Sequence, residues 1–546
     1  MSLLLSGLVA GTASKGSAQP TNSPGAPAPA GIAAATSSNS LPRPEFYMPG
    51  MQPKEAGIDL GEVATCRKCH ADTKNDLAND PDFSWEGGMM AQAARDPVFR
   101  AALAVANQDI AGVGEFCIRC HSPRAWLAGR STAPDGSSLD REDLNGVSCV
   151  VCHRLVDPRS PAGQAMVKQA PPGIGNGMYV ADPQIVERGP YADTKGLKMH
   201  GTLGSPYQGS SELCGNCHDV SNLTLAQDIK QQPPHTFGHI ERTYSEWALS
   251  DFARSDPPQT CQSCHFPRVA GGGQAVNYAS TYGDLHRDYF VRHGPSGGST
   301  WVQEALFRIW KGRDLDHQAL QAGQARAREF LKTAAALRLQ CSGGEAHLTI
   351  TNLTGHKLPT GYPEGRRMWV NVQFFDRDSK LIDEVGHYGE KTDMLGDQKV
   401  SVPTLLDPEK TRIYECLPGL SNKQAETFKK SQGASLHFIL NDLITKDNRI
   451  PPRGFTNAAF ASHLAAPVGA NYADGQYWDE LDFPLPPGTA EVGVRLMYQS
   501  VSWEYLKFLV EENKTDNWAT RLYEAWEQTG KCPPEEIASL KQPVSE

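Results

Sequence analysis

The stretch ATCRKCHADT, residues 64–73, contains Cys66 and Cys69 with two residues between them, and His70 follows directly. A Cys-x-x-Cys pair alone fits half of a zinc site, a redox dithiol or a haem attachment site. The trailing histidine favours the third option, because Cys-x-x-Cys-His is the attachment pattern of c-type haem. In that chemistry two thioether bonds hold the porphyrin edge and the histidine binds the iron from one face.

The pattern occurs four more times, as CIRCH (117–121), CVVCH (149–153), CGNCH (214–218) and CQSCH (261–265). A structural zinc site does not need a histidine after each pair, and a thioredoxin-like dithiol occurs as one copy. We therefore predict five haem c groups. The predicted attachment residues are Cys66, Cys69, Cys117, Cys120, Cys149, Cys152, Cys214, Cys217, Cys261 and Cys264. The predicted proximal iron ligands are His70, His121, His153, His218 and His265.

A low-spin electron-transfer haem also needs a sixth ligand, usually a second histidine or a methionine. Up to residue 300 the chain has five histidines outside the motifs, which we predict as distal ligands: His200, His235, His239, His286 and His293. His235 and His239 are four residues apart, so they face two haems if they share a helical turn. The preceding Pro233-Pro234 equally favours a loop.

Three residues compete for these distal positions. Met89 or Met90 offers a thioether ligand, although a methionine in the core is the simpler interpretation. His356 lies beyond the motif segment and would have to fold back onto a haem.

Other residues outside the motifs also suggest chemistry. Arg366 and Arg367 fit either haem propionates or a surface salt bridge. Two of the remaining cysteines are expected to form a disulfide in an oxidising compartment, and the sequence does not say which two. These cysteines are Cys341, Cys416 and Cys532.

Composition limits the partners. The net charge is −10, from 62 acidic and 52 basic residues, without a lysine and arginine cluster. This argues against nucleic acid, whose phosphates require a basic face. We expect redox partner proteins instead, and the sequence leaves a homo-oligomer or a filament open.

The N-terminus predicts export. Residues 3–10 are apolar and small residues follow at 16–18, so we interpret residues 1–18 as a signal peptide with a truncated start. C-type haem is normally attached outside the cytoplasm. No run approaches the ~18 apolar residues of a membrane span, so we expect a periplasmic or extracellular protein without a transmembrane segment.

At 546 residues the chain should contain several domains, and we predict an α+β multidomain protein. We predict that residues 19–45 are a disordered linker. Residues 46–302 are predicted to form a mostly helical and irregular pentahaem domain, with a clear helical stretch at 88–109. Connecting helices should occupy 303–337, including 317–337. An antiparallel β-sandwich with C-terminal helices should follow at 338–546, with a hairpin at Gly343-Gly344 and helices near 503–512 and 516–529.

Five further phrases complete a resemblance: WEGGMMAQAARDPVF (85–99), LNGVSCVVCH (144–153), MHGTLGSPYQGSSELCGNCH (199–218), ERTYSEWALSDF (241–252) and NLTGHKLPTGYPEGRRMWV (352–370). With the haem motifs, they resemble the multihaem c-type cytochromes of respiratory and metal-reducing bacteria. The resemblance implies an electron-carrying architecture, with His200 and His293 in distal positions. The fifth motif departs slightly, because CHFP stands where relatives often have CHMP.

The predicted function is electron transfer through five bis-histidine haems in respiratory or extracellular electron transport. One alternative is an oxidoreductase with an open haem that acts on a small nitrogen or sulfur compound. Another is the subunit of an extracellular cytochrome filament. Enough spare histidines are present to close every iron site, so a carrier without substrate turnover is favoured over an enzyme.

Haem occupancy can be counted by mass. The acid-denatured protein should exceed the processed polypeptide by five haem groups, and its N-terminus should lie near Gln19. A smaller excess would mean that at least one motif is empty. An intact Met1 on haem-loaded protein would contradict the signal-peptide interpretation.

Overall fold

The computed structural model describes residues 47–58, 60–71, 77–193, 200–270, 280–281, 289–311 and 315–544. The predicted signal peptide, the predicted linker and His286 lie outside these ranges.

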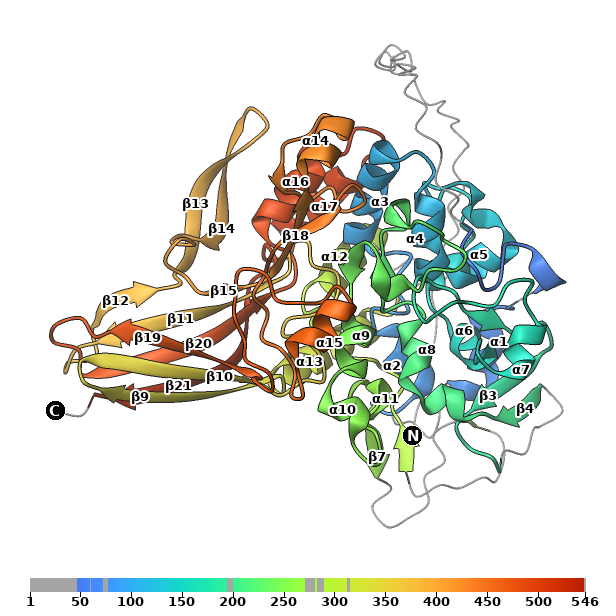
Figure 1. The fold of residues 1–546 in the computed structure, drawn as a ribbon, viewed down its shortest axis with the longest axis horizontal. Coiled ribbons are helices and arrows are strands. Elements are labelled where there is room, and N and C mark those ends of the chain that lie inside the picture. The colour runs from blue at the N-terminus through green and yellow to red at the C-terminus, as the bar shows by residue number, and fades with distance from the viewer. Residues whose placement is uncertain are drawn as a thin grey trace, which may run out of the picture. The chain divides into compact units, whose positions relative to one another are not determined.

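The segment that holds the haem motifs consists of short helices joined by long loops, drawn from blue to green in Figure 1. Its α-helices are α1 (Val63–His70), α2 (Pro81–Glu86), α3 (Pro97–Asp109), α4 (Gly114–His121), α5 (Pro123–Ala128), α6 (Cys149–Arg154), α7 (Pro161–Ala165), α8 (Ser211–Gly215), α9 (Thr243–Ala248), α10 (Asp251–Arg254) and α11 (Cys261–His265). Four small ladders tie the loops together: β1 (Leu155–Val156) with β2 (Val180–Ala181), β3 (Val186–Gly189) with β4 (Gly201–Gly204), β5 (Val220–Ser221) with β6 (His239–Glu241), and β7 (Arg268–Ala270) with β8 (Tyr289–Val291).

The helix predicted over 88–109 begins only at Pro97. Residues 88–95 form turns. The side chain of Asp96 accepts hydrogen bonds from the backbone N–H groups of Val98 (2.8 Å) and Phe99 (3.4 Å). An aspartate cap followed by proline is a strong helix start, so the local capping chemistry overrides the apolar pattern that precedes it.

The C-terminal half contains two larger antiparallel sheets. One has the order β19-β10-β9, and the other has β12-β11-β20-β21 with β15 paired to β11. Their strands are β9 (Ala335–Ser342), β10 (Glu345–Asn352), β19 (Trp478–Pro484), β11 (Arg367–Phe375), β12 (Leu381–Val385), β15 (Ile413–Tyr414), β20 (Glu491–Gln499) and β21 (Glu535–Pro543). The predicted hairpin is confirmed: Gly343 and Gly344 both have positive φ, as a two-residue turn requires, and Ser342 pairs with Glu345.

The two sheets bury their apolar residues in one cluster. It includes Leu348 and Ile350 from β10, Val370 and Val372 from β11, and Val494 from β20. The alternating pattern of the sequence therefore identifies the buried positions correctly. Helices with several antiparallel sheets agree with the α+β prediction, whereas the sandwich and the domain boundaries stay predictions.

Further elements complete this half: the hairpin β13 (Tyr388–Leu395) and β14 (Gln398–Leu405), the strands β16 (Cys416–Leu420), β17 (Gly433–Ala434) and β18 (Leu443–Asp447), and the helices α14 (Asn422–Phe428), α15 (Asn457–Ser462), α16 (Trp503–Glu512) and α17 (Trp518–Gln528). The predicted helices near 503–512 and 516–529 are thus confirmed. The sequence prediction missed β21, which pairs with β20 and is mostly polar.

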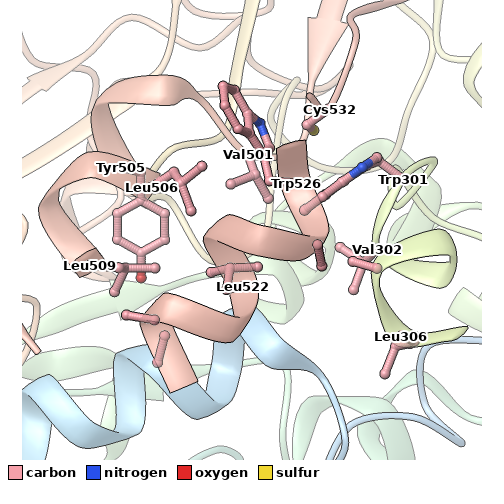
Figure 2. Packing of buried hydrophobic residues seen from close by; sticks show 14 of the residues in the cluster. Trp301, Val302, Leu306, Val501, Tyr505, Leu506, Leu509, Leu522, Trp526 and Cys532 are labelled. Carbon is pink, nitrogen blue, oxygen red and sulfur yellow. The ribbon is translucent and has the colours of Figure 1, made fainter. Parts of the chain in front are cut away.

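A second apolar cluster joins the two halves of the chain. The connecting helices α12 (Val302–Trp310) and α13 (His317–Leu331) pack with α3, α16 and α17. Figure 2 shows Trp301, Leu306, Leu522 and Trp526 converging in this cluster. The helix predicted over 317–337 ends earlier, because β9 already begins at Ala335.

The disulfide prediction is wrong. Cys341 lies in β9, Cys416 in β16 and Cys532 after α17, and all three thiols are free. The strands place these cysteines in separate environments; the Cys532 sulfur, for example, contacts the Ser500 hydroxyl at 3.6 Å. Within the described ranges, no helix has the length and apolar character needed to cross a membrane.

A glycine contact between α13 and the end of α2 should be sensitive to substitution. A methyl group on Gly323 would collide with the backbone carbonyl of Gly87. We expect Gly323→Ala to destabilise the protein by about 1–3 kcal/mol through overpacking, although alanine itself favours a helix over glycine by about 1 kcal/mol. Thermal unfolding of the haem-loaded protein should show a lower midpoint. Gln321→Ala, at an exposed position of the same helix, is the control, and equal midpoints for the two variants would refute the collision.

Candidate haem sites

Each motif is built on a single helical turn. Cysteines three residues apart and a histidine one residue later share one face of a helix. The motifs lie on α1, α4, α6 and α11, while the fourth begins in α8 and continues as a turn. Local structure therefore presents two thiols and one imidazole together at each site, as thioether attachment and iron binding require.

Backbone carbonyls fix the orientation of the proximal rings. The Nδ1 atoms of His121, His153 and His265 lie 3.1, 2.6 and 2.6 Å from the carbonyl oxygens of Ala93, Arg188 and Ser296. A protonated Nδ1 donates these bonds and leaves Nε2 as the metal-binding nitrogen. Burial also lowers the pKa of His121 and His265 to about 4, which keeps both rings neutral.

Three proximal histidines face a second imidazole at a specific spacing. The ring centroids of His70 and His200 are 6.4 Å apart, and those of His153 and His293 are 6.3 Å apart. Two imidazoles on opposite sides of one metal, each with its nitrogen about 2.0 Å away, have centroids roughly 6 Å apart. The predicted distal residues His200 and His293 thus lie where one iron fits between each pair.

The third pair involves the competitor His356. Its ring centroid lies 6.5 Å from that of His265, with an angle of 29° between the ring planes. Its Nδ1 faces the Lys357 carbonyl at 3.0 Å, again leaving Nε2 for a metal. The segment without a haem motif therefore supplies an imidazole at the fifth motif. The GHKLP phrase was the available signal in the sequence.

His121 and His218 have no second imidazole at this spacing in the described part of the chain. The ring of His121 stacks on Phe99, with centroids 3.8 Å apart. His235 stacks on His463 at 4.2 Å, too close for an iron between them. His239 lies on β6, and its buried Nδ1 has no hydrogen-bond partner among the described residues. The structure thus places His235 in a short 3-10 turn and His239 in a strand, not together on one helical turn.

Cysteines of different motifs lie against each other. In three pairs the thiols lie close enough for each to shift the pKa of the other: Cys66 with Cys149, Cys120 with Cys217, and Cys214 with Cys261. Cys152 also lies close enough to influence both cysteines of the fourth motif. The five motifs therefore form one connected group, in which the fourth neighbours the second, third and fifth.

His218, the predicted proximal histidine of the fourth motif, has a carboxylate partner. His218 Nδ1 lies 3.3 Å from Glu241 Oε1. Burial opposes the protonation of His218, but the hydrogen bond and charge of Glu241 outweigh it and raise the pKa of this histidine. A carboxylate behind a ligating imidazole increases the basicity of the ligand. No motif in the sequence indicates that Glu241 is the partner of this histidine.

The two arginines near the GHKLP phrase have different surroundings. Arg367 is committed to the protein, because its guanidinium bonds to Gln499 and pairs with Glu504 at 3.1 Å. Arg366 donates one bond to the Thr360 carbonyl at 2.6 Å. Its buried Nε has no partner among the described residues, so Arg366 fits a bound carboxylate such as a haem propionate.

A buried carboxyl group, that of Glu364, lies next to Tyr362. Burial raises the pKa of Glu364 to about 8, and neither carboxylate oxygen has a hydrogen-bond partner of normal geometry within the described ranges. Tyr362 lies next to it and close to Cys117, and its hydroxyl bonds to that of Tyr505 at 2.9 Å. Glu364 therefore keeps its proton to a higher pH than an ordinary carboxyl group does.

One comparison with known proteins, a family-model match, agrees with the motif chemistry. Residues 65–154, which hold the first three motifs, match the family model described as cytochrome c554 and c-prime. This match supports a multihaem c-type cytochrome and haem-based electron transfer. Among solved structures, the chain is similar to the crystal structure of a penta-heme cytochrome c552 from Thermochromatium tepidum. That similarity has 17% identity and a TM-score of 0.48, over 89% of this chain and 99% of the other. No curated protein matches the chain.

The carboxylate behind His218 should set the potential of one haem. Glu241→Gln removes a negative charge and weakens the hydrogen bond to the proximal ligand, so we expect one midpoint potential to rise by tens of millivolts. A spectroelectrochemical titration of the haem-loaded protein measures this shift. Glu212→Gln changes the same charge in α8 without contacting His218; an equal shift in both variants would contradict a role for the hydrogen bond.

Proposed function

We propose that the protein binds five covalently attached c-type haems and transfers electrons among them, in the periplasm or outside the cell. The observation that carries this proposal is the spacing of the paired imidazoles at the motifs, from 6.3 to 6.5 Å. Rings at this spacing suit six-coordinate iron, which changes its ligands little on electron transfer. The haem supplies the redox chemistry, while the protein holds the ligands and tunes their environment.

In this proposal, the ligand pairs are His70 with His200, His153 with His293, and His265 with His356. The second and fourth irons have His121 and His218 as proximal ligands, and His235, His239 and His286 are their distal candidates. Arg366 is positioned to bind a propionate. His356 thus replaces one of the five distal ligands expected from the sequence.

Electron movement follows from the neighbouring motifs. The mutual influence of the thiols places the first motif beside the third, and the second, third and fifth beside the fourth. Because the thioether bonds lie at the haem edge, close thiols bring haem edges together. We infer that the electron route runs between the first, third and fourth haems and branches at the fourth to the second and the fifth. Redox partner proteins would exchange electrons at the ends of this route.

The two C-terminal sheets have a supporting role in the proposal. Their shared apolar cluster is what a β-sandwich requires. We infer that this sandwich shields or docks against the haem segment and also donates His356 to the fifth site.

A second function is favoured by the surroundings of the second motif. An oxidoreductase needs an open iron and nearby groups that exchange protons. His121 has no imidazole partner in the described ranges, and Tyr362 lies close to Cys117 and next to Glu364. A small nitrogen or sulfur compound would be the substrate of such a site.

Spectroscopy separates the carrier from the oxidoreductase. We expect the oxidised protein to show only low-spin ferric signals in electron paramagnetic resonance, and the reduced protein to bind no carbon monoxide, because every iron has two fixed ligands. A stoichiometric high-spin haem that takes up carbon monoxide would favour the oxidoreductase. His200→Ala is the positive control, because it should open the first site.

A further inference from the structure

His356 is carried by a loop that leaves the end of β10. This loop, residues 353–359, follows Asn352, the last residue of that strand, and the chain then continues to β11. A loop is a weak support for a metal ligand unless other groups fix it, because a metal site tolerates displacements of only a few tenths of an ångström.

The C-terminal half holds the loop from one side. The Asn352 side-chain amide donates to the carbonyls of His356 (2.8 Å), Ile450 (2.9 Å) and Pro451 (3.0 Å). The backbones of Leu358 and Ile450 exchange hydrogen bonds of 3.0 and 3.2 Å. These contacts fix the loop to its own half but not to the haem segment.

One residue of the haem segment holds the loop from the other side. Glu246 lies in α9 between the fourth and fifth motifs and is fully buried. Its Oε2 accepts a hydrogen bond of 3.1 Å from the backbone N–H of Lys357, the residue after His356, and one of 2.9 Å from the Thr360 hydroxyl. Glu246 therefore contacts the chain on the C-terminal side of the proposed ligand.

Charges complete this connection. Glu246 pairs with Arg449 at 3.1 Å, Arg449 pairs with Asp447 at 2.7 Å, and Lys357 pairs with Asp447 at 2.6 Å. Two cations and two anions balance in a region where every side chain is nearly inaccessible to water. Removing Glu246 would leave a buried positive charge and unpaired donors, which is costly in such an environment.

Close packing supports the same contact. A methyl group on Gly355 would approach the Trp247 ring to 3.1 Å and the Phe252 ring to 3.4 Å. The loop thus packs directly on α9 and α10. If the contact with Glu246 is lost, the loop cannot compensate by moving closer to those helices.

We propose that Glu246 is a positioning residue, which holds His356 in reach of the fifth haem iron from the opposite half of the chain. This inference rests on the proposed ligation of that iron by His265 and His356. Glu246 does not touch the iron; it acts through the Lys357 amide and the Thr360 hydroxyl.

The experiment compares carbon monoxide uptake by four variants of the haem-loaded full chain. His356→Ala should raise uptake from none to one carbon monoxide per reduced protein, with one high-spin ferric haem. Glu246→Ala should give the same species, in a fraction of molecules or in all. Glu246→Gln loses the charge that pairs with Arg449 but retains an oxygen for both hydrogen bonds, so it should keep every haem low-spin. Asp479→Asn, which loses a buried carboxylate of the C-terminal half that bonds to Arg412 and Tyr414, should also remain low-spin.

The outcomes distinguish the two levels of the proposal. If His356→Ala leaves all haems low-spin, the ligation fails and the inference fails with it. If His356→Ala opens one haem but folded Glu246→Ala does not, only the positioning role is refuted. If Glu246→Ala fails to fold, Thr360→Val decides: partial carbon monoxide uptake supports the role, and no uptake refutes it.

Discussion

In the proposed haem sites two imidazoles share one iron, which requires that the protein hold them on opposite sides of it. The proximal ring comes with its motif on a helical turn, so its position follows from local structure. The proposed distal ring comes from a distant stretch: His200 precedes β4, His293 follows β8, and His356 lies beyond β10. Each of these stretches must be fixed to its motif by tertiary contacts, which explains why short ladders such as β3 with β4 and β7 with β8 lie beside the distal histidines.

Buried arginines support loops that have little regular structure. The Arg119 guanidinium donates to the carbonyls of Gly177, Met48 and Pro49 at 2.7, 3.2 and 2.7 Å. Arg242 similarly donates to the carbonyls of Val220, Phe237 and His463. A guanidinium offers five donors in a fixed plane, so one side chain satisfies carbonyls of several segments that no helix or sheet would pair. In this segment, buried hydrogen bonds from arginine side chains help to hold the chain together, as an apolar core does in other proteins.

Features that depend on neighbouring residues could be predicted from the sequence, whereas contacts between distant segments could not. The motifs, the Gly343-Gly344 turn and the alternating strands depend on short spacings, and the structure agrees with the turn and the strands. The start of α3 at Pro97 also has a local signal, the Asp-Pro cap, which the apolar pattern obscured. By contrast, β21 has one fully buried residue, Ile537, and is a strand because β20 is beside it. No spacing rule could reveal that His356 faces His265 or that Glu241 lies behind His218, because these contacts depend on how distant segments pack.

A ligand contributed by the other half of the chain would link metal binding to the docking of the two halves. The bond from His356 to the fifth iron would form only when the C-terminal sheets are seated on the haem segment, so its free energy would add to that of the apolar cluster and of the buried charges around Glu246. The reverse also holds, because any contact that stabilises the docked arrangement raises the occupancy of the sixth coordination position. The ligation of a haem site assembled in this way would depend on how the two halves pack, whereas the proposed first and third sites would need only histidines within the motif segment.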